Sequence, residues 1–164
     1  MGDDRGAGMT DATMAALGRI PSGLFVLTVS AGGTETGMLA SWVQQCSFTP
    51  PRVSVAVAKE RWVLPHLTDG AAFTVHVLPE GEKKLVAHFG KGFAPDAPAF
   101  VGLDVTRTAE GAPVLSAAHA HVACRVAARF DAGDHVLVIG DVVGGAVLHD
   151  ARPATHVRRS GAHY

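Results

Sequence analysis

The sequence is poor in charged residues, and the few that it has are balanced in sign. Only 18% of its 164 residues are charged, and 14 Lys and Arg stand against 15 Asp and Glu, which gives a net charge of −1. A protein that binds nucleic acid electrostatically needs a basic face, and this balance argues against one. It also argues against a polyacidic disordered tail. We therefore expect no nucleic-acid partner.

Long apolar runs are also missing. Apolar residues make up 48% of the chain, but Gly, Thr, Gln or a charge interrupts each run before the ~20 residues that a membrane-spanning helix needs. The first residues, MGDDRGAGMTDATM, carry acids where a signal peptide has a basic region followed by an apolar core. We expect no membrane association and a cytoplasmic location.

Cysteine is scarce, and the common catalytic motifs are absent. Cys46 and Cys124 form no CxxC pair, so two free thiols are expected, although a disulfide between them stays open. No GxGxxG follows a predicted strand, GKGF at 90–93 lacks the spacing of a P-loop, and HExxH and GxSxG do not occur. The nine histidines show no zinc-ligand spacing, so we predict no metal site.

What the sequence does have is glycine, 19 residues of it, between short Val-rich runs. Such a pattern favours a turn-rich β protein. Alternation predicts strands at 24–30, 52–58, 73–77, 121–130 and 135–143, with glycine turns at 31–34 and 144–145. Helices are expected at 12–17, 62–68 and 81–89. The best physical interpretation is one domain at 15–164 after a flexible lead at 1–14, built as an antiparallel barrel with a few covering helices.

The most distinctive segment is Gly37–Arg61, GMLASWVQQCSFTPPRVSVAVAKER. It predicts a strand that passes into an irregular polar loop and back. Small residues at Ala40 and Ser41 let a ligand approach the backbone, and hydroxyl and amide side chains follow. Lys59 and Arg61 then add positive charge, a mixture that suits a phosphate. A polar turn beside a solvated charged loop is the alternative interpretation of the same residues.

Several motifs together resemble one family. They are ALGRIPSGLFVLT (16–28), GMLASWVQQCSFTPP (37–51), VAVAKER (55–61), HFGKGFAP (88–95), GDH (133–135) and HVRRSGAHY (156–164). The chain resembles the flavin reductase-like, FMN-binding split-barrel family over about residues 15–164. It is most similar to the flavin reductase domain at the C-terminal end of flavodiiron proteins. The long second motif is specific evidence for this family, whereas GDH alone would be weak evidence.

The resemblance implies a mainly β fold, a six-stranded antiparallel split barrel that forms a homodimer with flavin near the interface. It implies FMN, with FAD possible, and NADH or NADPH as the co-substrate. Carried over by position, the flavin-binding residues are Leu39, Ala40, Ser41, Trp42, Gln45, Cys46, Ser47, Lys59, Arg61, His88 and Phe89. The phosphate candidates among them are Ser47, Lys59 and Arg61. For Cys46 a role as a small filler is favoured over redox activity.

The nicotinamide contacts implied by the resemblance are His135 of the GDH motif and Tyr164. The alternatives are a histidine that only braces the turn at 131–134 and a frayed terminus, and Phe89 is as well explained as core. Hydride passes from nicotinamide C4 to flavin N5, so the protein needs no acid or nucleophile and has only to position the two rings. The electrons would go to a monooxygenase or another redox protein.

Two other functions remain open from the sequence. The first is a flavin-binding module without reductase activity, and the second is a split-barrel protein with a different ligand, such as haem. Flavin absorption of the purified protein would exclude a different ligand such as haem. Bleaching of the flavin by NADH or NADPH would distinguish a reductase from a flavin-binding module without activity.

Overall fold

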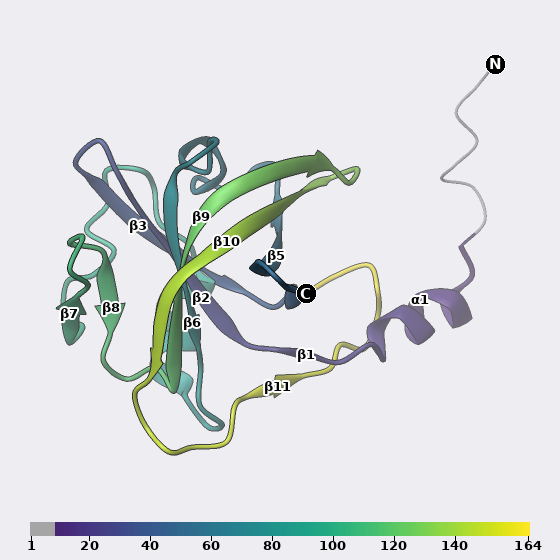
Figure 1. The fold of residues 1–164 in the computed structure, drawn as a ribbon. Coiled ribbons are helices and arrows are strands. Elements are labelled where there is room, and N and C mark those ends of the chain that lie inside the picture. Colours follow the sequence, from purple (N-terminus) through teal and green to yellow (C-terminus); the bar gives the residue numbers. More distant parts are fainter. Residues whose placement is uncertain (1–8) are drawn as a thin grey trace.

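A computed structural model describes residues 9–164. Its centre is a seven-stranded antiparallel sheet in the order β3-β2-β6-β9-β10-β5-β4 (Figure 1). The elements are α1 (Asp11–Gly18), β1 (Ser22–Gly23), β2 (Phe25–Ala31), β3 (Thr34–Ala40), β4 (Val43–Phe48), β5 (Pro51–Ala58), the 3-10 turn η1 (Leu64–His66), β6 (Ala72–Val77), α2 (Lys83–Gly90), β7 (Val105–Arg107), β8 (Pro113–Leu115), β9 (Ala120–Asp131), β10 (His135–Val147) and β11 (Thr155–His156).

The barrel interior follows from period-two alternation along the strands. In β5, Val53, Val55 and Val57 are buried in the main core cluster while the residues between them are partly exposed. The hairpin between β2 and β3 turns on Gly32 and Gly33, whose φ angles of 59° and 82° disfavour a side chain. The predictions of a strand at 52–58 and a turn at 31–34 are confirmed.

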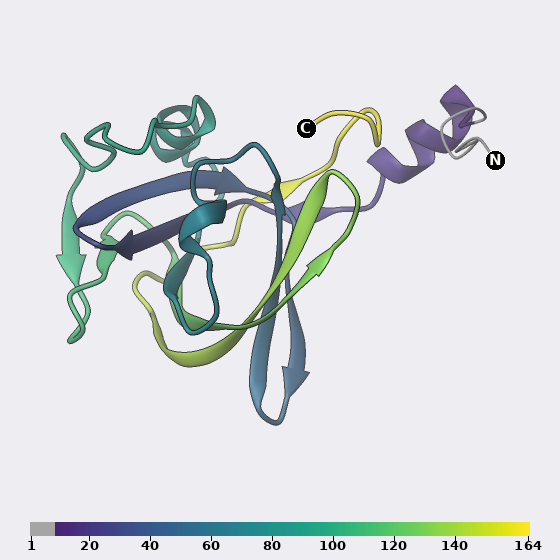
Figure 2. The same ribbon diagram turned by 90° about the horizontal axis from the view of Figure 1, so that it is seen from above.

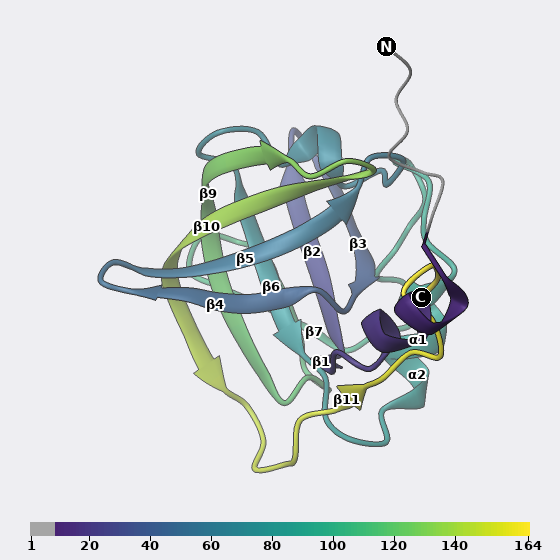
Figure 3. The same ribbon diagram turned by 90° about the vertical axis from the view of Figure 1, so that its right-hand side faces the viewer.

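The two edges of the sheet meet at a bend in the chain. β3 and β4 lie at opposite ends of the strand order, yet only Ser41 and Trp42 separate them in sequence. The N–H of Ala56 in β5 donates to the carbonyl of Trp42 at 3.0 Å, so the bend is tied to the strand beside the edge strand β4. The sheet therefore curls into a split barrel (Figure 3). If β3 and β4 are counted as one bent strand, the expected six-stranded antiparallel split barrel is confirmed.

A second layer covers one side of the barrel. α2 begins at Glu82, whose side chain accepts from the N–H of Leu85 at 3.0 Å. Leu85 and Phe89 then pack with residues of β2 and of the segment from 99 to 118 in a second apolar cluster. The expected helix at 81–89 is confirmed, with one face buried.

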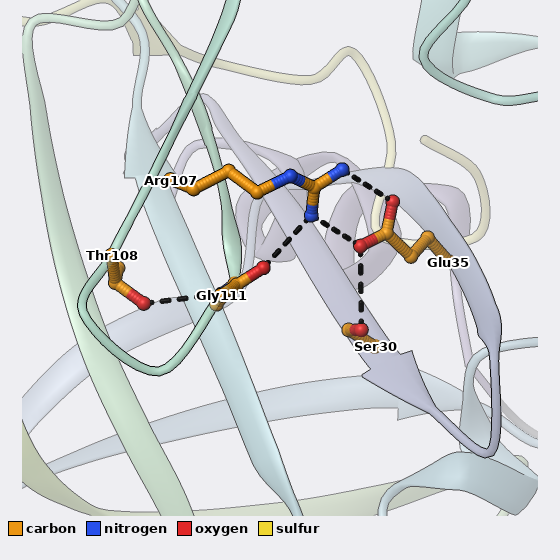
Figure 4. Close-up of polar contacts among 6 residues, drawn as sticks. Ser30, Glu35, Arg107, Thr108 and Gly111 are labelled. Atoms are coloured by element: carbon orange, nitrogen blue, oxygen red, sulfur yellow. Dashed lines mark hydrogen bonds and ion pairs between the residues drawn. The ribbon is translucent and has the colours of Figure 1, made fainter.

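The short β7–β8 pair is fastened to the β2–β3 hairpin by an ion pair. Arg107 at the end of β7 makes a two-pronged contact with Glu35 of β3, with Nη2 donating to Oε2 at 3.0 Å (Figure 4). Its Nη1 also donates to the carbonyl of Gly111 at 2.8 Å, and the hydroxyl of Ser30 donates to Glu35. The guanidinium group lowers the pKa of the Glu35 carboxyl.

Three local predictions are wrong. The irregular polar loop expected within Gly37–Arg61 is strand β4, with a bulge between Gln45 and Ser47. The expected turn at 144–145 lies inside β10, where Gly145 pairs with Val122. The expected helix at 62–68 is the 3-10 turn η1, because Pro65 removes a backbone donor.

The N-terminal part is helical from Asp11, as predicted for residues 12–17, and Thr10 caps the helix through the N–H of Thr13. Most of the expected flexible lead, residues 1–8, lies outside the described residues. Within residues 9–164, neither helix has the length and apolar character needed to cross a lipid bilayer.

Candidate functional site

A pocket of about 250 Å³ opens at the bend between β3 and β4. It has an apolar wall and only a few polar side chains, the usual character of a small-molecule site. Its lining includes seven of the residues predicted from sequence: Leu39, Ala40, Ser41, Trp42, Arg61, Phe89 and Tyr164. The other lining residues are Leu24, Met38, Ala56, Val86, Gly90 and His156.

Two residues that line this pocket each have a buried polar atom without a partner. In the described part of the chain, neither the Ser41 hydroxyl oxygen nor Arg61 Nε has a hydrogen bond. Leaving such a group unpaired costs about 1–3 kcal/mol, so native proteins rarely do so without a ligand or water nearby. A charged donor and a hydroxyl together on an apolar wall fit a flat, polar-edged, anionic cofactor such as a flavin nucleotide.

A second pocket of about 230 Å³ lies next to the first and shares Trp42 and Tyr164 with it. His135, the first residue of β10, also lines it. The ring of Trp42 lies 4.9 Å from that of His135 and 5.2 Å from that of Tyr164, centroid to centroid. The two aromatic side chains therefore form the wall between the pockets.

The hydrogen bonds of His135 fix its tautomer. Its Nδ1 lies 2.7 Å from a carboxylate oxygen of Asp134, which can only accept, so Nδ1 carries the proton. In the neutral ring Nε2 then accepts from the Tyr164 hydroxyl. The contact with His135 lowers the pKa of Asp134, and partial burial raises that of Tyr164. Of the two alternatives for His135, the structure therefore shows a bracing contact and a position at the pocket together.

The two predicted phosphate cations have different surroundings. Lys59 makes an ion pair with Asp131, 2.7 Å between Nζ and Oδ2, on an exposed surface. Arg61 instead lines the first pocket and also a neighbouring hollow of about 380 Å³. Lys91, which sequence reasoning missed, lines that hollow too, together with Glu60. Only its place in the GKGF segment after α2 could have suggested it.

Gln45, Cys46 and Ser47 are not brought to this pocket. They lie on β4, beyond the bend, where Gln45 and Cys46 are exposed. β4 and β5 project from the barrel as a hairpin (Figure 2). Cys46 and the buried Cys124 are both free thiols, as expected.

His88 and Phe89 have different places. Phe89 is 1% exposed and belongs to the second core cluster, while its edge also lines the pocket. His88 is not among the lining residues. Its Nε2 lies 2.7 Å from the carbonyl of Ala99, so it fastens α2 to the following loop. Within residues 9–164 no three His, Cys, Asp or Glu side chains are grouped to hold a metal ion.

Comparison with known proteins identifies the family. The model of the flavin reductase like domain matches residues 17–162, nearly the whole chain. The protein belongs to the flavin reductase-like family. Diflavin flavoprotein A 1 of Synechocystis is 39% identical over 151 residues, and a diflavin flavoprotein of Nostoc is 42% identical over 151 residues. Each match covers 91% of this chain but 26% of the relative, so this flavin reductase-like chain spans about a quarter of those proteins.

Solved structures of flavin reductases share the fold of this family member. The NADH:FAD oxidoreductase SgcE6 of Streptomyces globisporus matches with a TM-score of 0.81 at 29% identity, covering 87% of this chain and 85% of the other. The flavin reductase PheA2 matches with a TM-score of 0.75 at 26% identity, covering 87% and 90%. Family membership and shared fold thus agree.

Proposed function

We propose that this protein transfers hydride from NADH or NADPH to FMN. The observation that carries the proposal is one apolar pocket of a flavin reductase-like fold that is lined by Ser41 and Arg61, each with a buried polar atom (Ser41 Oγ, Arg61 Nε) that has no partner among the described residues. The relative SgcE6, described as an NADH:FAD oxidoreductase and solved with NAD and FAD fragments, supports the use of both partners.

The first pocket would hold the ring part of the flavin. Its volume of about 250 Å³ is just below the range of about 300–1,000 Å³ for whole small-molecule ligands. The rest of the cofactor would leave through the side where Arg61 lies, and the adjoining hollow with Arg61 and Lys91 would take the phosphate. We propose FMN because its single phosphate group can be neutralised by these two cations. FAD is the second candidate.

The flavin supplies the hydride-accepting ring when it is bound. Leu39, Phe89 and Trp42 would exclude water from the ring, and Ser41 would donate to or accept from its polar edge. His135 and Tyr164, in the second pocket, would orient the nicotinamide. No described side chain has to act as a nucleophile, because positioning two rings in contact accounts for the acceleration.

We further propose a homodimer. The β4–β5 hairpin ends in Phe48, which is 88% exposed, and the second half of β10 exposes Val143 and Val147. Exposed apolar side chains of this size favour a protein interface. A second copy on this hairpin would bring Gln45, Cys46 and Ser47 of one chain toward the flavin of the other. Light scattering coupled to size-exclusion chromatography measures the molar mass, which should be twice that of one chain.

The acceptor of the electrons stays a proposal: a separate monooxygenase or another redox protein. The cytoplasmic location likewise stays a prediction from the sequence.

Anaerobic spectroscopy tests the reductase. The purified protein with FMN should lose its absorption at ~450 nm on addition of NADH or NADPH, because hydride transfer reduces the flavin ring. His135→Ala should raise the KM for the nicotinamide more than it changes flavin binding. Bound flavin that neither nicotinamide bleaches would instead make the protein a flavin-binding module, and protein that binds no flavin would overturn the proposal.

A further inference from the structure

The C-terminal segment 155–164 packs against the N-terminal helix as well as against the barrel. Figures 1 and 3 show it running beside β1 and α1. The N–H of Gly161 donates to the carbonyl of Met14 at 2.6 Å, and the N–H of Arg158 donates to that of Gly18 at 3.0 Å. β11 continues the contact by pairing with β1. The two ends of the described chain thus form one small unit beside the barrel.

Two glycines allow this close approach. A Cβ added to Gly161 would lie 2.5 Å from Cβ of Leu17, and one added to Gly18 would lie 2.7 Å from the carbonyl oxygen of Arg158. Neither glycine has a positive φ. Glycine is therefore required at both positions for space and not for backbone conformation. Any larger residue pushes the segment away from α1.

The segment carries two side chains to the wall between the two pockets. The guanidinium carbon of Arg158 lies 5.0 Å from the ring centroid of Trp42, a cation–π distance. Tyr164 lies against the same ring and bonds His135. Tyr164 itself is 60% exposed, so little of its position comes from burial in the core. Its order depends on what holds the backbone of the segment.

We propose that α1 is a positioning brace for the site. Its contacts at Gly18 and Gly161 hold segment 155–164 so that Arg158 and Tyr164 stay against Trp42. The segment is then already ordered before the nicotinamide binds. Binding therefore does not have to order it, and the free energy of binding is more favourable. Gly18 acts through other residues and is a positioning residue, whereas Gly161 also lines the second pocket directly. The effect on catalysis rests on the proposed function, whereas the placement of the segment does not.

The first experiment needs no ligand or activity. The chain has two tryptophans, so Trp62→Phe leaves Trp42 as the single tryptophan, which is excited selectively over tyrosine at the red edge of the absorption band. In this background Gly161→Ala and Gly18→Ala should make Trp42 more accessible to acrylamide, because the segment that covers it is displaced. Gly144→Ala is the matched control, since a Cβ there meets nothing within 4 Å and its φ is not positive. Equal quenching in the control and in both brace variants would overturn the proposal.

The second experiment shows whether the brace acts through Tyr164. The KM for the nicotinamide is measured for Gly18→Ala, Tyr164→Ala and the double variant, because Gly18 lines neither pocket. We expect each single change to raise KM roughly three- to tenfold and the double variant to match Tyr164→Ala alone, because residues that act as one unit are not additive. Multiplicative effects would overturn the coupling. If neither the unmodified protein nor any variant oxidises NADH or NADPH, the proposed function is wrong. The acrylamide quenching still tests whether α1 holds the segment in place.

Discussion

Replacing Arg61 by alanine tests most directly where a flavin phosphate binds. The Arg61 guanidinium borders both the ring pocket and the neighbouring hollow, and its Nε is buried without a partner among the described residues. A phosphate there would gain a charge-assisted hydrogen bond, which contributes about 1.5–3 kcal/mol. Its loss should weaken FMN binding roughly 10- to 150-fold.

Lys59 provides the matched comparison, because it has the same charge two residues away. Its ammonium group already pairs with Asp131, and the side chain is 45% exposed. An exposed pair of this kind contributes only about 0–1 kcal/mol. Lys59→Ala should therefore change the FMN dissociation constant by less than about fivefold.

The assay is a titration of FMN and riboflavin into each variant, followed by quenching of flavin fluorescence. Riboflavin lacks the phosphate, so Arg61→Ala should weaken FMN binding much more than riboflavin binding. Arg61→Lys keeps the charge and should restore part of the FMN affinity. Equal losses for the two flavins would show that Arg61 contacts the ring, and equal effects of the two alanine variants would refute the assignment of the phosphate to the Arg61 side.

Three further predictions concern the fold. Gly140→Ala should lower the free energy of unfolding by about 1–3 kcal/mol, measured in urea, because its Cβ would collide with the ring of Phe73; unchanged stability would show that the core can adapt. Glu35 has a lowered pKa in the fold through Arg107, so its contribution is present above the ordinary pKa and is lost as the pH falls through the folded value. Glu35→Gln should thus flatten the acid limb of the stability curve, and an unchanged limb would contradict this. Burial raises the pKa of the Cys124 thiol to about 12, so in a variant whose other cysteine is serine, a thiol reagent should react only after unfolding.

The strands were predictable because alternation depends on local sequence. A strand with Val53, Val55 and Val57 on one face can bury only that face, whatever its neighbours are. The exceptions occur where long-range pairing outweighs local preference. Gly145 favours a turn by itself, but pairing with Val122 of β9 keeps it in β10. The polar run after Trp42 favours a loop, but pairing with β5 makes it a strand.

The site divides in the same way. The family motif at 37–61 placed Leu39, Ala40, Ser41 and Trp42 together, because neighbours in sequence at a bend are neighbours in space. It could not decide between the two cations at 59 and 61. Lys59 is held by Asp131, which is 72 residues away, and a contact at that separation is decided by strand register.

The sequence alone therefore determined the class of fold, the strand faces and the segment that forms the pocket, all of which follow from local periodicity and a contiguous motif. Only the tertiary structure decided that Arg61 and not Lys59 faces the pocket, that Lys91 lines the neighbouring hollow, and that the last residues lie on α1. The physical reason is that these contacts join residues far apart in the chain. Their geometry exists only after the sheet has curled and its register is set.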